Sequence, residues 1–121
     1  MVFKKIESYK DLEIWKEGMA LAERIYRVTD SFPKQEVYGL VSQVRRAAIS
    51  IPANIAEGCA RNHSKEFRQF LYIALGSLAE LGTLVELSER LHFVIAETAV
   101  KLDETIKVLR YRILALLRKL S

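Results

Sequence analysis

Two groups of side chains in the sequence have a spacing that could support chemistry. Glu89 and His92 lie three residues apart, the spacing of the Glu-x-x-His motif that binds di-metal centres inside helix bundles. Such a centre needs two of these motifs, and His63, the other histidine, has no glutamate three residues before it. One motif without its counterpart does not predict a metal site, and we expect no cofactor.

Cys59 is the second candidate, because a thiolate beside His63 could act as a nucleophile. The two residues are four apart, but Asn62 and Ser64 predict a turn at this point. The sequence also has no glycine-rich phosphate loop, no dinucleotide fingerprint and no CxxC motif. We therefore predict that the chain is not an enzyme and has no small-molecule substrate.

Composition narrows the class of protein further. The chain has 121 residues, enough for one domain with a core of its own, and 50% of them are hydrophobic. A lone cysteine excludes an internal disulfide and suits a reducing cytosol, so we expect a cytoplasmic protein. The first 15 residues lack the apolar region of a signal peptide. No apolar run approaches the roughly 20 residues that span a bilayer, so we expect no membrane partner.

The formal net charge is +4, and the positive excess lies on residues 32–62 and 93–121. Accessible cations on these segments could contact the phosphates of RNA or DNA, although a charged face that keeps the protein soluble has the same composition. Arg118 and Lys119 are most simply explained as partners of a helix dipole. The remaining candidates for nucleic-acid binding are Arg45, Arg46, Arg61, Lys65, Arg68, Lys107, Arg110 and Arg112.

Apolar residues recur at steps of three and four along four segments, which is typical of amphipathic helices. We predict helices at about 10–31, 35–60, 64–91 and 96–119, within one domain of residues 1–121. No segment alternates with a period of two, and the connections are short. The pattern therefore predicts an all-α fold, an antiparallel up-down-up-down four-helix bundle.

Local signals mark most of these helix ends. Ser8, with Asp11 three residues later, predicts the first helix start, and Pro33 predicts its end. Ser64 predicts the cap of the third helix, whereas LHFVIAE at 91–97 offers no cap for the fourth. Pro52 predicts a kink in the second helix near residues 48–52. The alternative is a clean break, in which Ser50 caps a second short helix.

The second helix has a further unusual property between residues 47 and 60. Apolar residues lie on both of its faces, and Glu57 is its one charge, so it must be covered on two sides. One side can meet the bundle core, and we expect a second copy of the chain to cover the other. The candidates for this oligomer interface are Ile49, Pro52, Ala53, Ala56 and Ala60.

Five polar residues occur in apolar surroundings: Ser50, Asn54 and Glu57 on one side of the second helix, and Ser77 and Glu80 on the apolar half of the third. A buried polar group must be paired. One hypothesis is that Asn54 and Glu57 bond across helices, or satisfy carbonyls freed by Pro52, and so fix the helix register. The alternative is a solvated edge, with Glu57 loosely paired to Arg61.

Several sequence blocks carry a family resemblance: DLEIWK at 11–16, SFPKQEVYGL at 31–40, QVRRAAISIPANIAEG at 43–58 and SKEFRQFLYIALGSLAEL at 64–81. They resemble the four-helix-bundle proteins encoded within intervening sequences of bacterial 23S rRNA genes. Gly82 stands where relatives more usually carry glutamate.

The resemblance implies a ring of five subunits and no catalytic residues. A related branch, the accessory variability determinant proteins of diversity-generating retroelements, binds nucleic acid and a reverse transcriptase through basic surfaces. We therefore expect a ring-forming, non-catalytic protein that contacts RNA or DNA. The alternative is an interaction scaffold that docks a polymerase and has no direct role with nucleic acid.

Overall fold

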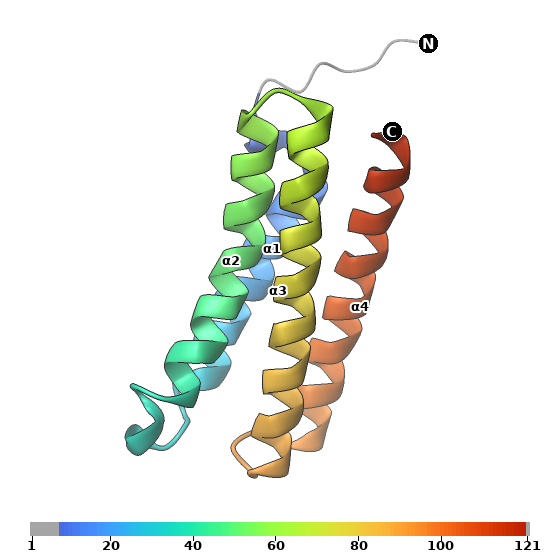
Figure 1. The fold of residues 1–121 in the computed structure, drawn as a ribbon. Helices are drawn as coiled ribbons and strands as arrows, with labels where there is room; N and C mark the ends of the chain where they lie inside the picture. Colours follow the sequence, from blue (N-terminus) through green and yellow to red (C-terminus); the bar gives the residue numbers. More distant parts are fainter. Residues whose placement is uncertain (1–7, 121) are drawn as a thin grey trace.

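The computed structural model describes residues 8–120, which form four long helices and two short 3-10 turns. The helices are α1 (Glu13–Thr29), α2 (Leu40–Ala60), α3 (Ser64–Arg90) and α4 (Ala96–Lys119), and the turns are η1 (Tyr9–Asp11) and η2 (Lys34–Glu36). Within this range there is no strand, so the predicted all-α fold is confirmed. Figure 1 shows that successive helices run in opposite directions. The expectation of no signal peptide concerns residues that lie partly outside the described range.

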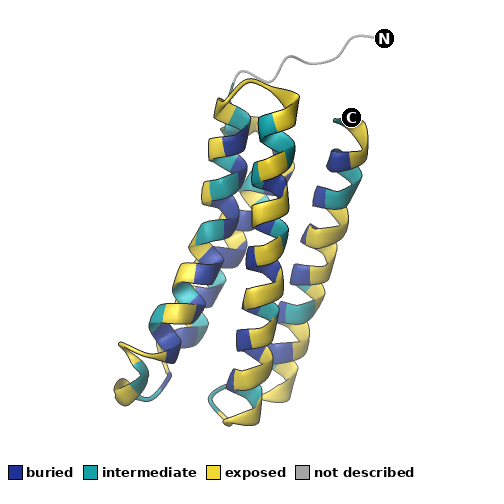
Figure 2. Cartoon of the chain, in the orientation of Figure 1, coloured by how far each residue is buried: buried dark blue, intermediate teal, exposed yellow. Residues whose placement is uncertain are grey.

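The core is built from the residues that recur at steps of three and four. Each helix turns its buried side toward the others (Figure 2), and each fully buried aliphatic side chain contributes about 1.5–3 kcal/mol to folding. The larger of these side chains are Leu21, Ile25, Val44, Ile51, Ile55, Leu71, Leu78, Leu81, Leu102, Leu109 and Ile113.

Helix α3 corrects one expectation about hydropathy. By length and composition alone it is apolar enough to cross a bilayer. Leu71, Leu78 and Leu81, however, are fully covered by the rest of the chain. A helix that packs in a bundle core can match a spanning helix in length and composition, so we assign α3 to the bundle core.

Helix α2 passes through Pro52 without interruption, so the alternative of a clean break capped by Ser50 is wrong. Pro52 is buried beside α1 at Gly18, where an added Cβ would lie 3.4 Å from both Cβ and Cδ of the proline. The proline therefore lies inside α2 with its pyrrolidine ring packed against α1. The kink stays a prediction.

The first two helices are shorter than the sequence predicts. Ser8 accepts a hydrogen bond from the Lys10 N–H and so caps η1, whereas α1 begins after Leu12 without a side-chain cap. Helix α1 ends at Thr29, four residues before Pro33. Helix α2 begins at Leu40 rather than near residue 35, because η2 and a turn occupy residues 34–39.

The two later turns use residues in the left-handed conformation. Asn62 has φ of 61° in the predicted turn after α2, a conformation that asparagine tolerates well. Ser64 is the first residue of α3 rather than its cap. His92 has φ of 63° between α3 and α4, and Ile95 precedes α4 with no side-chain cap, as the sequence predicts.

Helices α2 and α3 lie close together at Gly58, where a Cβ would lie 2.6 Å from the Cβ of Phe70. We predict that Gly58→Ala lowers the free energy of unfolding by about 2 kcal/mol, because the helices must separate. At Gly82 a Cβ would meet nothing within 4 Å. Gly82→Ala should raise the free energy by up to about 1 kcal/mol, since alanine favours the helix. Urea denaturation measures both, and equal effects would contradict the close approach.

Candidate nucleic-acid interface and assembly surface

The eight predicted cations do not form one surface. Arg45 and Arg46 lie near the start of α2, and Arg61 follows its last residue, about 24 Å further along the helix axis at 1.5 Å per residue. Lys65 and Arg68 lie with Arg61 at the α2–α3 end of the bundle, and the other three lie on α4. The cations therefore fall into groups at different heights of the bundle.

Arg45 holds α2 against the end of α1. Its Nε donates to Thr29 Oγ1 at 2.9 Å, its Nη2 donates to the Tyr26 carbonyl oxygen at 3.2 Å, and its guanidinium lies 4.4 Å from the centre of the Tyr26 ring. The Tyr26 carbonyl is one of the last four of α1, which lack the regular backbone partner within the helix, and the Thr29 hydroxyl also donates to it at 3.3 Å. Arg45 thus acts first as a cap for a neighbouring helix.

Arg68 has the same role at the opposite end of the bundle. It donates to the carbonyl oxygen of Leu117, in the last turn of α4, and its guanidinium lies 5.9 Å from the centre of the Tyr72 ring. A cavity of about 350 Å³ beside it is lined by Arg68, Tyr72 and Arg118, together with two leucines. This end of the bundle therefore combines cations with an aromatic ring.

Three other candidate cations pair with carboxylates. Arg61 contacts Glu57 at 3.0 Å and Glu66 at 3.7 Å. Lys107 contacts Asp103 at 2.9 Å, and this hydrogen bond raises the pKa of the lysine. Arg112 pairs with Glu17 and so connects α4 with α1. Their charges are partly neutralised within the chain.

The remaining candidates are Arg46, Lys65 and Arg110, which are all exposed. Within residues 8–120 none of them has an ion pair or a side-chain hydrogen bond. Their charge is available to an external anion. These three residues are the part of the predicted set that best fits phosphate binding.

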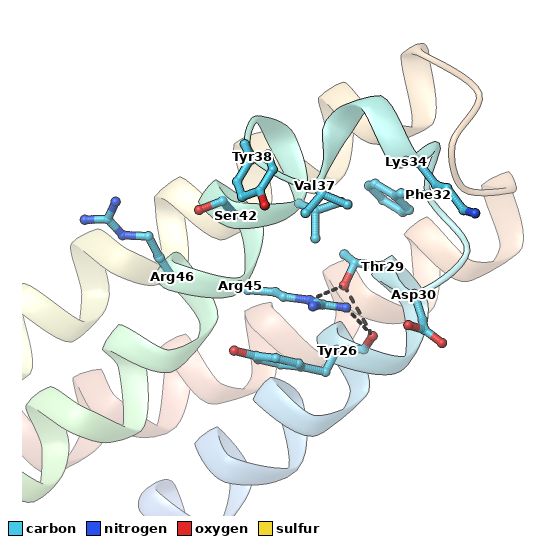
Figure 3. Close-up of a pocket in the computed structure, with 11 residues that line it drawn as sticks. Tyr26, Thr29, Asp30, Phe32, Lys34, Val37, Tyr38, Ser42, Arg45 and Arg46 are labelled. Atoms are coloured by element: carbon cyan, nitrogen blue, oxygen red, sulfur yellow. Dashed lines mark hydrogen bonds between the residues drawn. The ribbon is translucent and has the colours of Figure 1, made fainter.

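The structure adds tyrosines that the sequence analysis did not single out. Tyr38 is 97% exposed and Tyr111 is 67% exposed. Tyr38 and Tyr26 line a cavity of about 410 Å³ together with Arg45 and Arg46, which we call the α1–α2 cavity (Figure 3). The available signal was the occurrence of a tyrosine within eight residues of the Arg45–Arg46 pair.

The apolar face opposite the core is exposed in the single chain. Ile49 is 44% exposed, Ala53 and Ala60 are exposed, and Ala56 is partly covered. We call these four residues the outer stripe of α2. Pro52 does not belong to the outer stripe, because its ring is buried against α1. Its prediction as an interface residue is therefore wrong.

The polar cluster joins α2 to α3 through hydroxyl and amide groups. The Ser50 and Ser77 hydroxyls are 2.7 Å apart, and Asn54 Nδ2 donates to the Ser50 carbonyl at 2.8 Å and to its hydroxyl at 2.9 Å. The carbonyl that Pro52 frees belongs to Ala48, so Asn54 does not satisfy it. The bond across the helices therefore comes from Ser50, and Asn54 orients it.

The two predicted carboxylates lie outside this network. Glu57 is exposed and pairs with Arg61 at the end of its own helix, so the hypothesis that it bonds across helices is wrong. Glu80 is also exposed, and it lines a cavity of about 370 Å³ with Gln43 and Arg46. The solvated-edge alternative describes these two residues.

The residues considered for catalysis do not form a site. Burial, and to a lesser extent the Asp11 carboxylate, raise the pKa of the Cys59 thiol, which favours the less reactive protonated form. Among residues 8–120, no group of three or more histidine, cysteine, aspartate or glutamate side chains is placed to hold a metal ion.

Comparison with known proteins agrees with the sequence blocks. A family model described as 23S rRNA-intervening sequence protein matches residues 10–115. A crystal structure of a protein of unknown function from the S23 ribosomal protein family of Bacteroides thetaiotaomicron has a similar fold, with a TM-score of 0.77 at 21% sequence identity. The match covers 86% of this chain and 97% of that one. The comparison with curated proteins finds no match.

The network between α2 and α3 predicts unequal roles for Asn54 and Glu57. Asn54→Leu should lower the free energy of unfolding by about 1–2 kcal/mol, because Ser50 loses a donor in half-buried surroundings. Glu57→Gln, which removes an exposed pair, should change it by less than about 0.5 kcal/mol. Thermal unfolding followed by circular dichroism measures both. An Asn54→Leu protein as stable as the wild type would remove the network from the account.

Proposed function

We propose a function for a chain that belongs to the family of 23S rRNA-intervening sequence proteins. In this proposal the protein is non-catalytic, assembles with copies of itself and associates with RNA or DNA through its basic surface. The supporting observation is that Arg46, Lys65 and Arg110 are exposed and have no partner among the described residues.

An exposed tyrosine near one of these cations supports the same proposal. Phosphates require accessible positive charge, and unpaired bases stack on exposed aromatic rings. Tyr38 lines a cavity with Arg46. A cation and an exposed ring therefore occur together at this place on the surface.

Assembly would make this modest charge effective. Copies that meet through the outer stripe of α2 would cover Ile49 and Ala53, which the single chain leaves exposed. Five copies, the number implied by the family resemblance, would present each basic patch five times. Linked weak sites bind with a combined affinity well above that of one site.

Nucleic-acid binding should depend on the unpaired cations more than on net charge. Replacing Arg46, Lys65 and Arg110 with glutamine should weaken binding to an RNA oligonucleotide and reduce the slope of log affinity against log salt by about 2, at roughly 0.7 for each phosphate that is no longer bound. Fluorescence anisotropy over a range of roughly 50 to 300 mM salt, in which the screening of exposed charges changes strongly, measures the slope.

The matched control removes three cations that pair with carboxylates four residues before them. These are Arg61, Arg90 and Lys107, which contact Glu57, Glu86 and Asp103. Their replacement with glutamine should have a smaller effect, although the net charge falls equally. No affinity of the wild type for RNA or DNA at low salt would contradict the proposal and favour the scaffold that docks a polymerase.

The proposed assembly predicts that one substitution in the outer stripe dissociates the copies. Ile49→Glu places a charge at the centre of the surface that the copies would cover. The mass of the Ile49→Glu protein in sedimentation velocity should therefore fall below that of the wild type. Val108 on α4 is 49% exposed, and Val108→Glu is the control, because it also replaces an exposed aliphatic side chain with glutamate but lies outside the stripe. Equal masses for Ile49→Glu and wild type would exclude the stripe as the interface.

A further inference from the structure

The α1–α2 cavity lies at the end of the bundle where η2 and the following turn connect the first two helices. Its volume of about 410 Å³ falls within the range of pockets that hold small organic groups. Its residues come from α1, the connection and the first turns of α2. The cavity is therefore a feature of this connection and not of the contact between α2 and α3.

One wall of the cavity is a flat, fixed cation. Two hydrogen bonds, to Thr29 Oγ1 and to the Tyr26 carbonyl, hold the Arg45 guanidinium over the Tyr26 ring. Figure 3 shows the Arg45 side chain lying between this ring and the space below Val37. A planar guanidinium that already stacks on an aromatic ring offers its other face to a further planar group.

The facing wall carries Tyr38 and Val37, which are 97% and 47% exposed. In Figure 3 both side chains lie across the cavity from Arg45 and Tyr26. A tyrosine on a turn, with almost no cover from its own chain, is available to stack on a ligand. The two walls together present an aromatic ring on one side and a guanidinium on the other.

The charges around the cavity favour an anionic ligand. Lys34, Arg45 and Arg46 line it, against one carboxylate from Asp30. The nearby Glu36 carboxylate accepts a hydrogen bond from the Leu40 N–H at 3.3 Å and so serves the start of α2. Lys34 and Arg46 lie toward opposite ends of the cavity in Figure 3.

We propose that the α1–α2 cavity binds an unpaired base of single-stranded RNA or DNA. The base stacks between Tyr38 and the Arg45 guanidinium, and the phosphates on its two sides approach Arg46 and Lys34. This inference rests on the proposed function and adds to it a preference for single strands over duplexes. A base within a duplex is paired and stacked on its neighbours, so it cannot enter the cavity.

The test compares a 12-nucleotide single strand with a hairpin duplex of the same number of phosphates, both followed by fluorescence anisotropy with the full chain. The wild type should bind the single strand more tightly. Tyr38→Ala should weaken single-strand binding about tenfold, as expected for the loss of one stacked base, and change duplex binding less than about twofold. Tyr38→Phe keeps the ring and should keep the affinity.

Tyr111→Ala is the matched control, because Tyr111 is also an exposed tyrosine beside an arginine but lies on α4. It should leave the preference for the single strand unchanged. If Tyr38→Ala binds the single strand as well as the wild type does, or weakens both ligands equally, the cavity proposal fails and the general proposal stands. If the wild type binds neither ligand at low salt, both fail.

Discussion

Between residues 47 and 60, helix α2 has small or apolar side chains on more than one face, and the rest of the structure follows from how they are covered. On one side Pro52 packs against α1 at Gly18, and on another Gly58 lets α3 approach to the distance of a Cβ contact with Phe70. These two glycines allow α1 and α3 to pack closely against α2. The outer stripe, with Ile49 at 44% exposure, is what the chain leaves uncovered.

Polar groups then fix what apolar packing leaves free. The Ser50–Ser77 contact joins α2 to α3, and an arginine from a neighbouring helix donates to one carbonyl in the last turns of α1 and another in α4. Arg45 and Arg68 therefore serve the fold before they can serve a ligand. The charge that remains for an external partner is smaller than the formal count indicates. It lies on a few exposed side chains, of which Arg46 shares a cavity with Tyr38.

The number and type of the helices could be predicted from the sequence because periodicity is a local property, and the unbroken pattern through Pro52 correctly favours a continuous helix. The roles of the cations could not. Arg45 finds Thr29 sixteen residues away, and Arg112 finds Glu17 across the bundle, so only the packed chain shows which charges are occupied. For the same reason the sequence analysis assigned Pro52 wrongly to the oligomer interface, because its partner Gly18 belongs to another helix.

The account depends most on the claim that the outer stripe of α2 is covered in solution. The most direct measurement is the mass of the unmodified protein by light scattering at micromolar concentration. The account predicts a mass several times the 13.9 kDa of one chain, and about 70 kDa for five copies. A stable monomer of 13.9 kDa across this concentration range would contradict it.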